Sequence, residues 1–264
     1  MHLCINYQTR RFLRKGGSGA LYETINLLND EIVVAKIVPF LGHEVEQAFK
    51  HEVEIMCELK DCPNILNIIE YETTRNYGCI ILPQMKGDLI DLLEECFFLE
   101  EKIARQVFYQ ICVGVKVCHD KGIAHLDIKP DNILQSYSGN IYLADFGGSV
   151  KLKKMHDFIF TGTKVYAAPE VRGRCKLNHP LAADVWSLGI VLFTLLTGAW
   201  PYCDDNITPD TPPELQHPQL SFESSRFLKK ILQRDPLLRP TIDDVLSDPW
   251  FSPALKRPHR STTL

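Results

Sequence analysis

The chain has 264 residues, of which 45% are hydrophobic and 23% are charged, and its formal net charge is -4 at pH 7. These values are ordinary for a globular protein and argue against a disordered, collagen-like or coiled-coil chain. Because the chain has no net basic charge to attract a polyanion, the composition also predicts no nucleic-acid partner.

The cysteines and the apolar runs indicate the cellular compartment of the protein. Nine scattered cysteines, none in a C-x-x-C spacing, favour reduced thiols over a disulfide framework or a zinc ribbon. Residues 1–11 contain no apolar stretch typical of a secretory signal. The longest apolar run, 185–200, is interrupted by Ser187, Gly189 and Gly198, so we expect a buried helix and no membrane association. An intracellular protein, in the cytoplasm or the nucleus, is the resulting expectation.

Short strands dominate the first 85 residues, and one helix, 44–59, interrupts them. The predicted strands are rich in Ile, Val and Leu and are separated by Gly, Asn or Asp; they are 10–13, 20–26, 32–38, 65–71 and 79–82.

After residue 86 the apolar spacing becomes helical. Apolar residues recur every three to four positions over 103–118, which predicts a helix of about 18 residues. Further helices are predicted at 88–95, 182–196, 221–233 and 241–246, with an irregular proline-rich loop over 200–218. A strand-rich half followed by a helix-rich half predicts an α+β fold in two lobes.

Two charged residues interrupt apolar patterns in the first half. Lys36 shares a face with Val34 and Val38 in the strand 32–38, and Glu52 lies in the apolar stripe of the helix 44–59. A buried ammonium group needs a counter-charge. We therefore predict that Lys36 and Glu52 form an ion pair; an ordinary structural salt bridge would give the same pattern.

A glycine-rich segment, RKGGSGAL, precedes them at 14–21 and contains Gly16, Gly17 and Gly19. Glycines allow backbone amides to approach a polyphosphate closely. Hairpin turns use the same residues, so the segment by itself leaves both interpretations open.

The second half contains a polar loop and a strand that ends in an acid. In IAHLDIKPDNIL, at 123–134, Asp127, Lys129 and Asn132 lie between apolar flanks. The apolar strand 141–144 ends at Asp145, which two glycines follow closely. Carboxylate and amide oxygens suit a hard divalent cation. A turn or cap role explains one such Asp, but explains less well both segments in this order.

Together these segments resemble the eukaryotic protein kinase family over about residues 12–251, and specifically its Ser/Thr members. The matching segments, in the family's order, are KGGSGAL, Lys36 in VVAK, Glu52, HLDIKPDN, DFGG and the Ala-Pro-Glu of 168–170. The resemblance implies a bilobal kinase fold in one domain, 1–255, with an N-lobe to about 82, a hinge at 83–86, a C-lobe over 87–255 and a basic tail, 256–264.

The resemblance implies a role for each matching residue. Asp127 and Lys129 would be catalytic, and Asn132 and Asp145 would hold Mg²⁺. The ATP-binding residues would be Gly16, Gly17, Gly19, Leu21, Ala35, Lys36, Glu52, Leu82, Pro83 and Met85. Leu82 would be the gatekeeper, and adenine would bind the Pro83 carbonyl and the Met85 amide, since proline has no N–H.

The implied partners are protein substrates. Lys129, two residues after Asp127, and Thr163 resemble the Ser/Thr-specific members. Asp88 and Asp131 lie where some kinases recognise basic residues, which implies a preference for Arg-containing peptides. Arg239 would pair with Glu170. The Leu-Asp catalytic motif and the Leu-Pro hinge also resemble kinases of large DNA viruses, which would place the protein in a host cell.

Two residues depart from the family pattern. Arg14 stands at the first glycine of the glycine-rich loop, where it would stiffen the loop or contact phosphate. Leu126 replaces the arginine that receives an activation-loop phosphate in many members. The alternatives are a pseudokinase that acts as a nucleotide-binding or scaffold module, and a small-molecule kinase. Retention of the charged residues argues against the first, and Thr163 with Ala-Pro-Glu against the second.

The loss of the arginine at position 126 predicts activity without activation-loop phosphorylation. Alanine substitution of Ser149 or of Thr161 should leave phosphoryl transfer in place, measured with purified protein and a peptide substrate. Loss of activity in either variant would contradict the prediction. Thr163 is unsuitable for this test because the resemblance gives it a role near the substrate.

Overall fold

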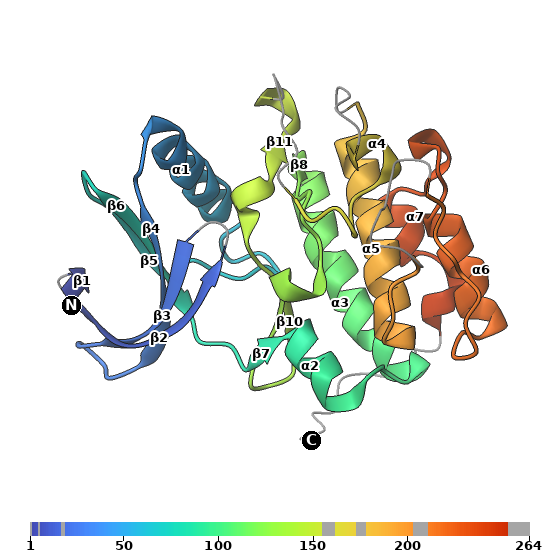
Figure 1. Cartoon of the computed structure of the whole chain (residues 1–264), viewed down its shortest axis with the longest axis horizontal. Coiled ribbons are helices and arrows are strands. Elements are labelled where there is room, and N and C mark those ends of the chain that lie inside the picture. The colour runs from blue at the N-terminus through green and yellow to red at the C-terminus, as the bar shows by residue number, and fades with distance from the viewer. Residues whose placement is uncertain are drawn as a thin grey trace.

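A six-stranded antiparallel sheet, in the order β1-β2-β3-β4-β6-β5, forms the first lobe of the computed structural model (Figure 1). The structure describes residues 2–4, 6–16, 19–154, 162–172, 178–202 and 211–252. The strands of this sheet are β1 (His2–Cys4), β2 (Tyr7–Gly16), β3 (Gly19–Asn26), β4 (Ile32–Pro39), β5 (Glu70–Thr73) and β6 (Tyr77–Pro83).

Helix α1 (His43–Glu58) packs against this sheet, as its apolar stripe predicts. Phe49, Val53 and Met56 are buried on that stripe, and Glu52 is buried among them. The predicted helix 44–59 is therefore confirmed to within one residue at each end. The burial of a carboxylate on this face requires a cation on the facing strand.

Helices form the second lobe, to the right in Figure 1. Those of four or more residues are α2 (Leu89–Cys96), α3 (Glu101–Asp120), α4 (Pro169–Arg172), α5 (Pro180–Thr197), α6 (Phe222–Ile231) and α7 (Ile242–Leu246). Side-chain caps begin several of them where the sequence places a polar residue: Asp88 caps α2, Ser221 caps α6 and Thr241 caps α7. The two-lobed α+β prediction is confirmed.

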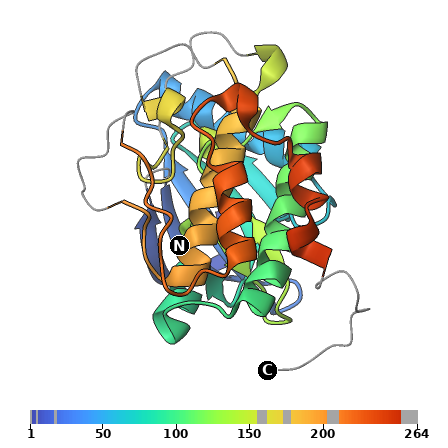
Figure 2. The same cartoon turned by 90° about the vertical axis from the view of Figure 1, so that its right-hand side faces the viewer.

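Helix α5 is the centre of this lobe. It is apolar and long enough to cross a membrane by length and composition, yet 89% of its residues are buried inside the protein. In Figure 2 it runs beside α3 and α6, which cover it. The prediction of a buried core helix for the longest apolar run is thus confirmed, and it places the buried Asp184 in the first turns of the helix.

The second lobe also contains small sheets. β7 (Gly87–Asp88), β9 (Ile133–Gln135) and β10 (Ile141–Leu143) form one, and β8 (Ile123–Ala124) pairs with β11 (Val150–Lys151). These pairings bring the polar loop after β8 and the acid after β10 to one edge of the lobe. Single 3-10 turns complete the fold: η1 (Pro130–Asn132), η2 (Phe146–Gly148), η3 (Leu152–Lys154), η4 (Pro236–Leu238) and η5 (Pro249–Phe251).

The predicted strand 65–71 is wrong over most of its length. Ile65, Leu66 and Ile68 are buried, but only the bridge between Ile65 and Leu143 resembles strand pairing, and the strand itself is Glu70–Thr73. The apolar run packs into the core between the lobes instead. An apolar run indicates that its residues are buried, but buried residues do not have to pair with another strand.

The helical lobe is tied together by a buried arginine. Arg239 donates to both carboxylate oxygens of Glu170, over 2.6 and 2.8 Å, and to the backbone carbonyls of Ala182, Gln233 and Arg234. Its guanidinium also lies over the Trp186 ring, 5.0 Å from the centroid. The predicted Arg239–Glu170 pair is confirmed.

Replacement of Arg239 by Lys should lower the free energy of unfolding by about 3 kcal/mol, because an ammonium cannot satisfy a bidentate carboxylate and three carbonyls at once. Urea unfolding measures the loss. Arg226→Lys is the matched control, since Arg226 pairs with Asp248 from a side chain that is 45% exposed. Equal, small losses in both variants would contradict the assigned role of Arg239.

Candidate active site

Strand register determines which side chains of the first lobe face the site. Lys36 lies opposite Leu21 on β3 and opposite Ile80 on β6, and directly opposed residues of a sheet share a face. By the same alternation Val34 and Leu82 lie on this face. Leu21 and Leu82 are half-buried there, as the sequence-based assignment requires.

Ala35 requires a correction. It packs with Val33, Cys79 and Ile81 in a separate small cluster on the other face of the sheet. The prediction that Ala35 lines the nucleotide site is wrong, because neighbouring side chains of a strand point to opposite faces. Val34, and not Ala35, shares a face with Lys36. The alternation of side chains along a strand is the sequence signal that identifies Val34.

Lys36 joins two carboxylates from different parts of the chain. Its Nζ lies 2.6 Å from Oε1 of Glu52 on α1 and 2.9 Å from Oδ1 of Asp145, which follows β10. The Lys36 and Glu52 side chains are 8% and 4% exposed, whereas that of Asp145 is 37% exposed and opens toward solvent. The predicted Lys36–Glu52 pair is confirmed, and Asp145 is its third member.

Burial and charge set the protonation of these three groups. Burial by itself lowers the pKa of Lys36, but the charges of Glu52 and Asp145 together raise this pKa above its ordinary value, so the ammonium stays charged. Burial raises the pKa of Glu52, and the nearby Asp145 adds to the rise. Burial also acts to raise the pKa of Asp145, but the Lys36 charge and hydrogen bond hold it below its ordinary value.

The polar loop after β8 is closed by a network around Asp127. Asn132 donates from Nδ2 to the backbone carbonyl of Asp127, over 2.8 Å, and to its Oδ2, over 2.9 Å. Lys129 Nζ lies 2.8 Å from the same Oδ2. Thr163 donates to Oδ1 from its backbone N–H and from its hydroxyl, and Lys129 donates to that hydroxyl over 2.8 Å.

The loop lies directly beside Asp145. The Ala144 amide donates to the backbone carbonyl of Asn132 over 2.9 Å, and His125 Nε2 donates to the Ala144 carbonyl over 2.9 Å. The residues predicted from two separate segments, Asp127 with Asn132 and Asp145, therefore lie at one place in the fold. It is the place where Lys36 of the first lobe reaches Asp145 of the second.

The backbone of this region is strained. Leu126 and Asp145 adopt the left-handed region, with φ of 62° and 58°, which costs about 1–2 kcal/mol for a residue other than glycine. Asp184 on α5 holds the first of them: its carboxylate accepts from the backbone amides of His125 and Leu126, each over 2.8 Å, and from His119 Nε2 over 2.9 Å. The sequence indicated Asp184 only as the start of a helix.

Two oxygen atoms remain suited to a divalent cation. Asn132 donates both amide hydrogens to Asp127, so its Oδ1 is the end left for a cation, and Asp145 uses Oδ1 for Lys36. Hard oxygen ligands of this kind fit Mg²⁺, which keeps several waters or substrate phosphates as further ligands. Consistent with so few protein ligands, the described segments contain no cluster of three or more His, Cys, Asp or Glu side chains arranged for a metal.

The glycine-rich hairpin has a steric reason for one glycine. A Cβ atom on Gly19 would lie 2.7 Å from the Ile37 carbonyl oxygen, whereas one on Gly16 would make only ordinary contact. Gly16 pairs with Gly19 at the end of β2 and β3. Gly17 lies outside the described residues. Close packing on β4 therefore explains Gly19 without a ligand, and the phosphate-binding assignment of these glycines stays a prediction.

The segment that links the lobes begins where β6 ends at Pro83. Leu82, Pro83 and Met85 are half-buried there, and the next residue, Lys86, donates from its amide to the Gln135 carbonyl over 2.8 Å. The predicted hinge thus coincides with the connection between β6 and β7. The adenine-binding roles of its backbone groups stay predictions.

Arg14 has a partner that the sequence did not indicate. Its Nη1 lies 2.8 Å from Oδ2 of Asp88, the residue that caps α2, so this pair joins β2 to the helical lobe. Arg14 is 53% exposed and Asp88 only 5%. The arginine at the first glycine position therefore bridges the two lobes.

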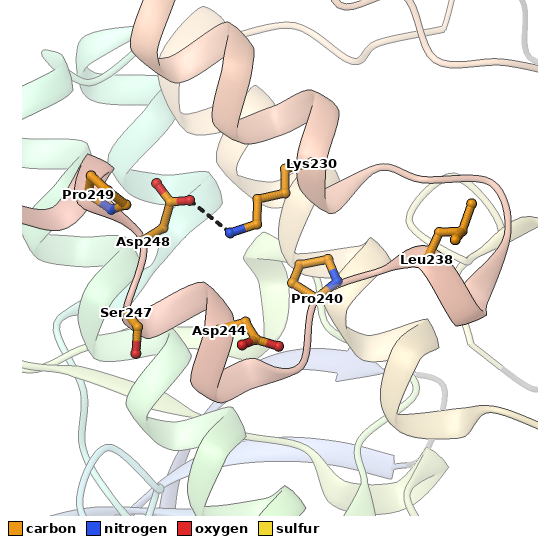
Figure 3. A pocket seen from close by; sticks show the side chains of 7 residues that line it. All are labelled: Lys230, Leu238, Pro240, Asp244, Ser247, Asp248 and Pro249. Atoms are coloured by element: carbon orange, nitrogen blue, oxygen red, sulfur yellow. Dashed lines mark hydrogen bonds and ion pairs between the residues drawn. The ribbon is translucent and has the colours of Figure 1, made fainter.

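A separate pocket of about 350 Å³ lies among α6, α7 and the turns around them (Figure 3). The residues that line it are Lys230, Leu238, Pro240, Asp244, Ser247, Asp248 and Pro249. It shares no residue with the cleft. Its two acids are already paired, Asp248 with Lys230 and Asp244 with Thr241, so we assign it no ligand.

Asp184→Ala should lower the free energy of unfolding by about 3 kcal/mol, because it leaves two buried backbone amides and a histidine N–H without an acceptor. Urea unfolding measures the change, and the same variant should lose any activity that depends on the loop geometry. Asp243→Ala, which removes a 65% exposed acid, is the control and should change stability far less. Equal stability of the two variants would refute this role of Asp184.

With this geometry established, the chain was compared with known proteins. It matches the model described as "Protein kinase domain" over residues 7–251. CBL-interacting protein kinase 32 of Oryza sativa subsp. japonica is 33% identical over 228 residues, which cover 83% of this chain and 52% of that protein.

Other relatives give the same family. CBL-interacting serine/threonine-protein kinase 15 of Arabidopsis thaliana is 30% identical over 266 residues, 96% of this chain and 63% of that protein. A probable serine/threonine-protein kinase of Dictyostelium discoideum is 33% identical over 234 residues, 86% of this chain and 27% of that protein. The matched segment covers 50–63% of the length of the CBL-interacting kinases compared and 27% of the Dictyostelium discoideum relative. With the family model covering nearly all of its described residues, the chain belongs to the protein kinase domain family.

Proposed function

We propose that this chain is a serine/threonine protein kinase that transfers the γ-phosphate of ATP to Ser and Thr hydroxyls of protein substrates. The observation that carries the proposal is the convergence of Lys36, Glu52 and Asp145 beside the Asp127 network where the two lobes meet. The family uses ATP and a divalent metal ion. Relatives named as serine/threonine-protein kinases support the choice of acceptor.

The charged residues account for the binding of the nucleotide. Lys36, held between two carboxylates, presents an ammonium that would contact the α- and β-phosphates, and the amides of the glycine-rich loop would cover them. Asn132 and Asp145 would hold Mg²⁺ through their remaining oxygens. When bound, Mg²⁺ offsets the negative charge between the β- and γ-phosphates.

The Asp127 network accounts for the acceptor. The Thr163 hydroxyl already donates to Asp127 Oδ1 over 3.1 Å and accepts from Lys129 over 2.8 Å. The carboxylate and the ammonium thus already contact an aliphatic hydroxyl, which supports their proposed roles toward a Ser or Thr acceptor. Asp127 would orient the acceptor hydroxyl and accept its proton, and Lys129 would stabilise the charge on the transferring phosphoryl group.

The alternative proposal of a pseudokinase lacks a supporting observation. Each ionisable or amide side chain that the chemistry needs is present, and the structure brings them together: Lys36, Glu52, Asp127, Asn132 and Asp145. A kinase for small molecules is also less favoured. Thr163 bonds the catalytic loop, and the Ala-Pro-Glu segment is anchored through the bidentate Arg239–Glu170 pair, so the two features that resemble protein kinases are both built into the fold.

The proposed substrates are proteins, with a preference for basic residues near the acceptor. Asp131, exposed after the catalytic Lys129, supports this preference. Asp88 supports it less than the sequence indicated, because its carboxylate caps α2 and holds Arg14. An intracellular location is likewise proposed, and it is supported by six cysteines of the described segments that take part in no disulfide.

The test is transfer of the γ-phosphate from ATP to a generic basic protein with Mg²⁺. Lys36→Met and Asp145→Asn should each lower the transfer rate by about a hundredfold or more, since each removes a charge that faces the phosphates. Lys116→Met is the matched control, because Lys116 also holds two acids but lies on α3, outside the cleft.

Three results separate the hypotheses. Transfer by the parent and the control, lost in both site variants, supports the kinase. Nucleotide binding without transfer by the parent would support the pseudokinase instead. Equal transfer by all four proteins would identify a contaminating activity and would contradict the proposal.

A further inference from the structure

Helix α1 carries Glu52, but its C-terminal end is electrostatically unfavourable. Glu54 and Glu58 lie one turn apart, at i and i+4, and the last turn contains no basic residue. Like charges at this spacing repel each other, and a carboxylate at a helix C-terminus opposes the helix dipole. The sequence of α1 therefore places two acids at this end, where a cation from another element would be favourable.

Lys151 supplies this cation from the segment that follows Asp145. Its Nζ lies 2.9 Å from Oε1 of Glu54 and 2.5 Å from Oε2 of Glu58, and the Lys151 side chain is only 16% exposed. Burial alone lowers the pKa of Lys151, but the two carboxylates raise this pKa above its ordinary value, so the ammonium is charged at neutral pH.

The position of Lys151 is fixed by backbone pairing. It lies on β11 opposite Ile123 of β8, and the next amide, that of Leu152, donates to the Gly122 carbonyl over 2.9 Å. β8 leads directly into the loop that contains Asp127. The cation that holds the end of α1 is thus part of the same small sheet that positions the catalytic loop.

A second contact lies one residue before Glu52. His51 Nε2 donates to the Ser149 carbonyl over 2.9 Å, and the buried Ser149 donates from its hydroxyl to the His125 carbonyl over 3.2 Å. Glu52 is therefore flanked by two connections to the segment 149–151.

The hydrogen bond of the Ser149 hydroxyl also affects the test of activation-loop phosphorylation. Ser149→Ala removes a structural bond as well as a possible phosphorylation site, so Thr161→Ala is the clearer test.

We propose that Lys151 is a positioning residue that holds α1, and with it the Glu52–Lys36 pair, in the catalytic arrangement without a phosphate on the activation loop. This inference rests on the proposed kinase function. It explains how a chain with Leu126 in place of the phosphate-receiving arginine keeps Glu52 on Lys36: an internal ammonium, paired with two acids of α1, anchors the helix to the catalytic lobe.

The experiment compares two charge reversals in phosphatase-treated protein. Lys151→Glu should lower kcat about tenfold and speed amide hydrogen exchange in residues 43–58 about tenfold, as expected for loss of a partly buried three-charge network. Lys116→Glu is the matched control: Lys116 also bridges two acids, Asp120 and Asp243, over 2.9 and 2.7 Å. It should leave both readouts near the parental values.

Two further variants separate positioning from general stability. Lys151→Arg keeps a cation and should stay within about twofold of the parental kcat. The exchange pair Lys151→Glu with Glu58→Lys keeps two carboxylates and one ammonium at the site. It should recover most of the lost rate and of the lost hydrogen-exchange protection, and the cation it places at the end of α1 suits the helix dipole.

Parental kcat and parental exchange in Lys151→Glu would overturn the proposal, and so would an equal loss in Lys116→Glu or no recovery in the exchange pair. A parent protein that transfers no phosphate would instead contradict the proposed function. In that event, hydrogen exchange in 43–58 still decides whether Lys151 holds α1, so the two failures are distinguishable.

Discussion

The structure depends on one buried ammonium group shared by two carboxylates. Lys36 comes from a strand of the first lobe, Glu52 from the helix packed on that strand, and Asp145 from the second lobe. Each charge is costly to bury alone, so removing one of the three would leave a buried charge without its partner. The Asp145 side chain stays 37% exposed in this arrangement. Lys36 contacts its Oδ1, so Oδ2 is the oxygen proposed to bind a metal ion.

The second lobe provides the rigidity that this arrangement needs. Helix α5 is buried on nearly all sides, and its one acid, Asp184, accepts from the amide of His125 and from that of Leu126, whose backbone is strained. The strain is tolerated because a carboxylate in a low-dielectric core binds those amides strongly. The packing of α5 in the core thereby holds the backbone of Leu126, the residue that precedes Asp127.

The two departures from the family pattern have a common explanation. Arg14 forms an ion pair with Asp88 across the lobes, and Lys151 forms one with Glu54 and Glu58. Both pairs bring a cation of one lobe to an acid of the other. Ion pairs thus connect the lobes at two places besides the Lys36–Asp145 contact, in a chain where Leu126 cannot bind an activation-loop phosphate.

The sequence by itself determined the fold class and most helices, because periodicity is a local signal, whereas the residues of the site were named through family resemblance and their roles stay predictions. It predicted the Lys36–Glu52 and Arg239–Glu170 pairs from a charge in an apolar stripe and from family resemblance, and the structure confirms both. It failed where an apolar run is compatible with either a strand or irregular buried chain. The pattern of 65–71 predicts a strand, but Ile65 and Leu66 pack into the core.

Only the tertiary structure decided which charges meet across the fold. That Arg14 reaches Asp88, that Lys151 reaches the end of α1 and that Asp184 holds the catalytic loop are facts of long-range geometry, with partners 58 to 97 positions apart. No sequence period encodes such distances. Exposed or capping residues gain a partner only after helix packing and strand register have brought their backbones together, which is the physical reason why the pattern along the chain could not name them.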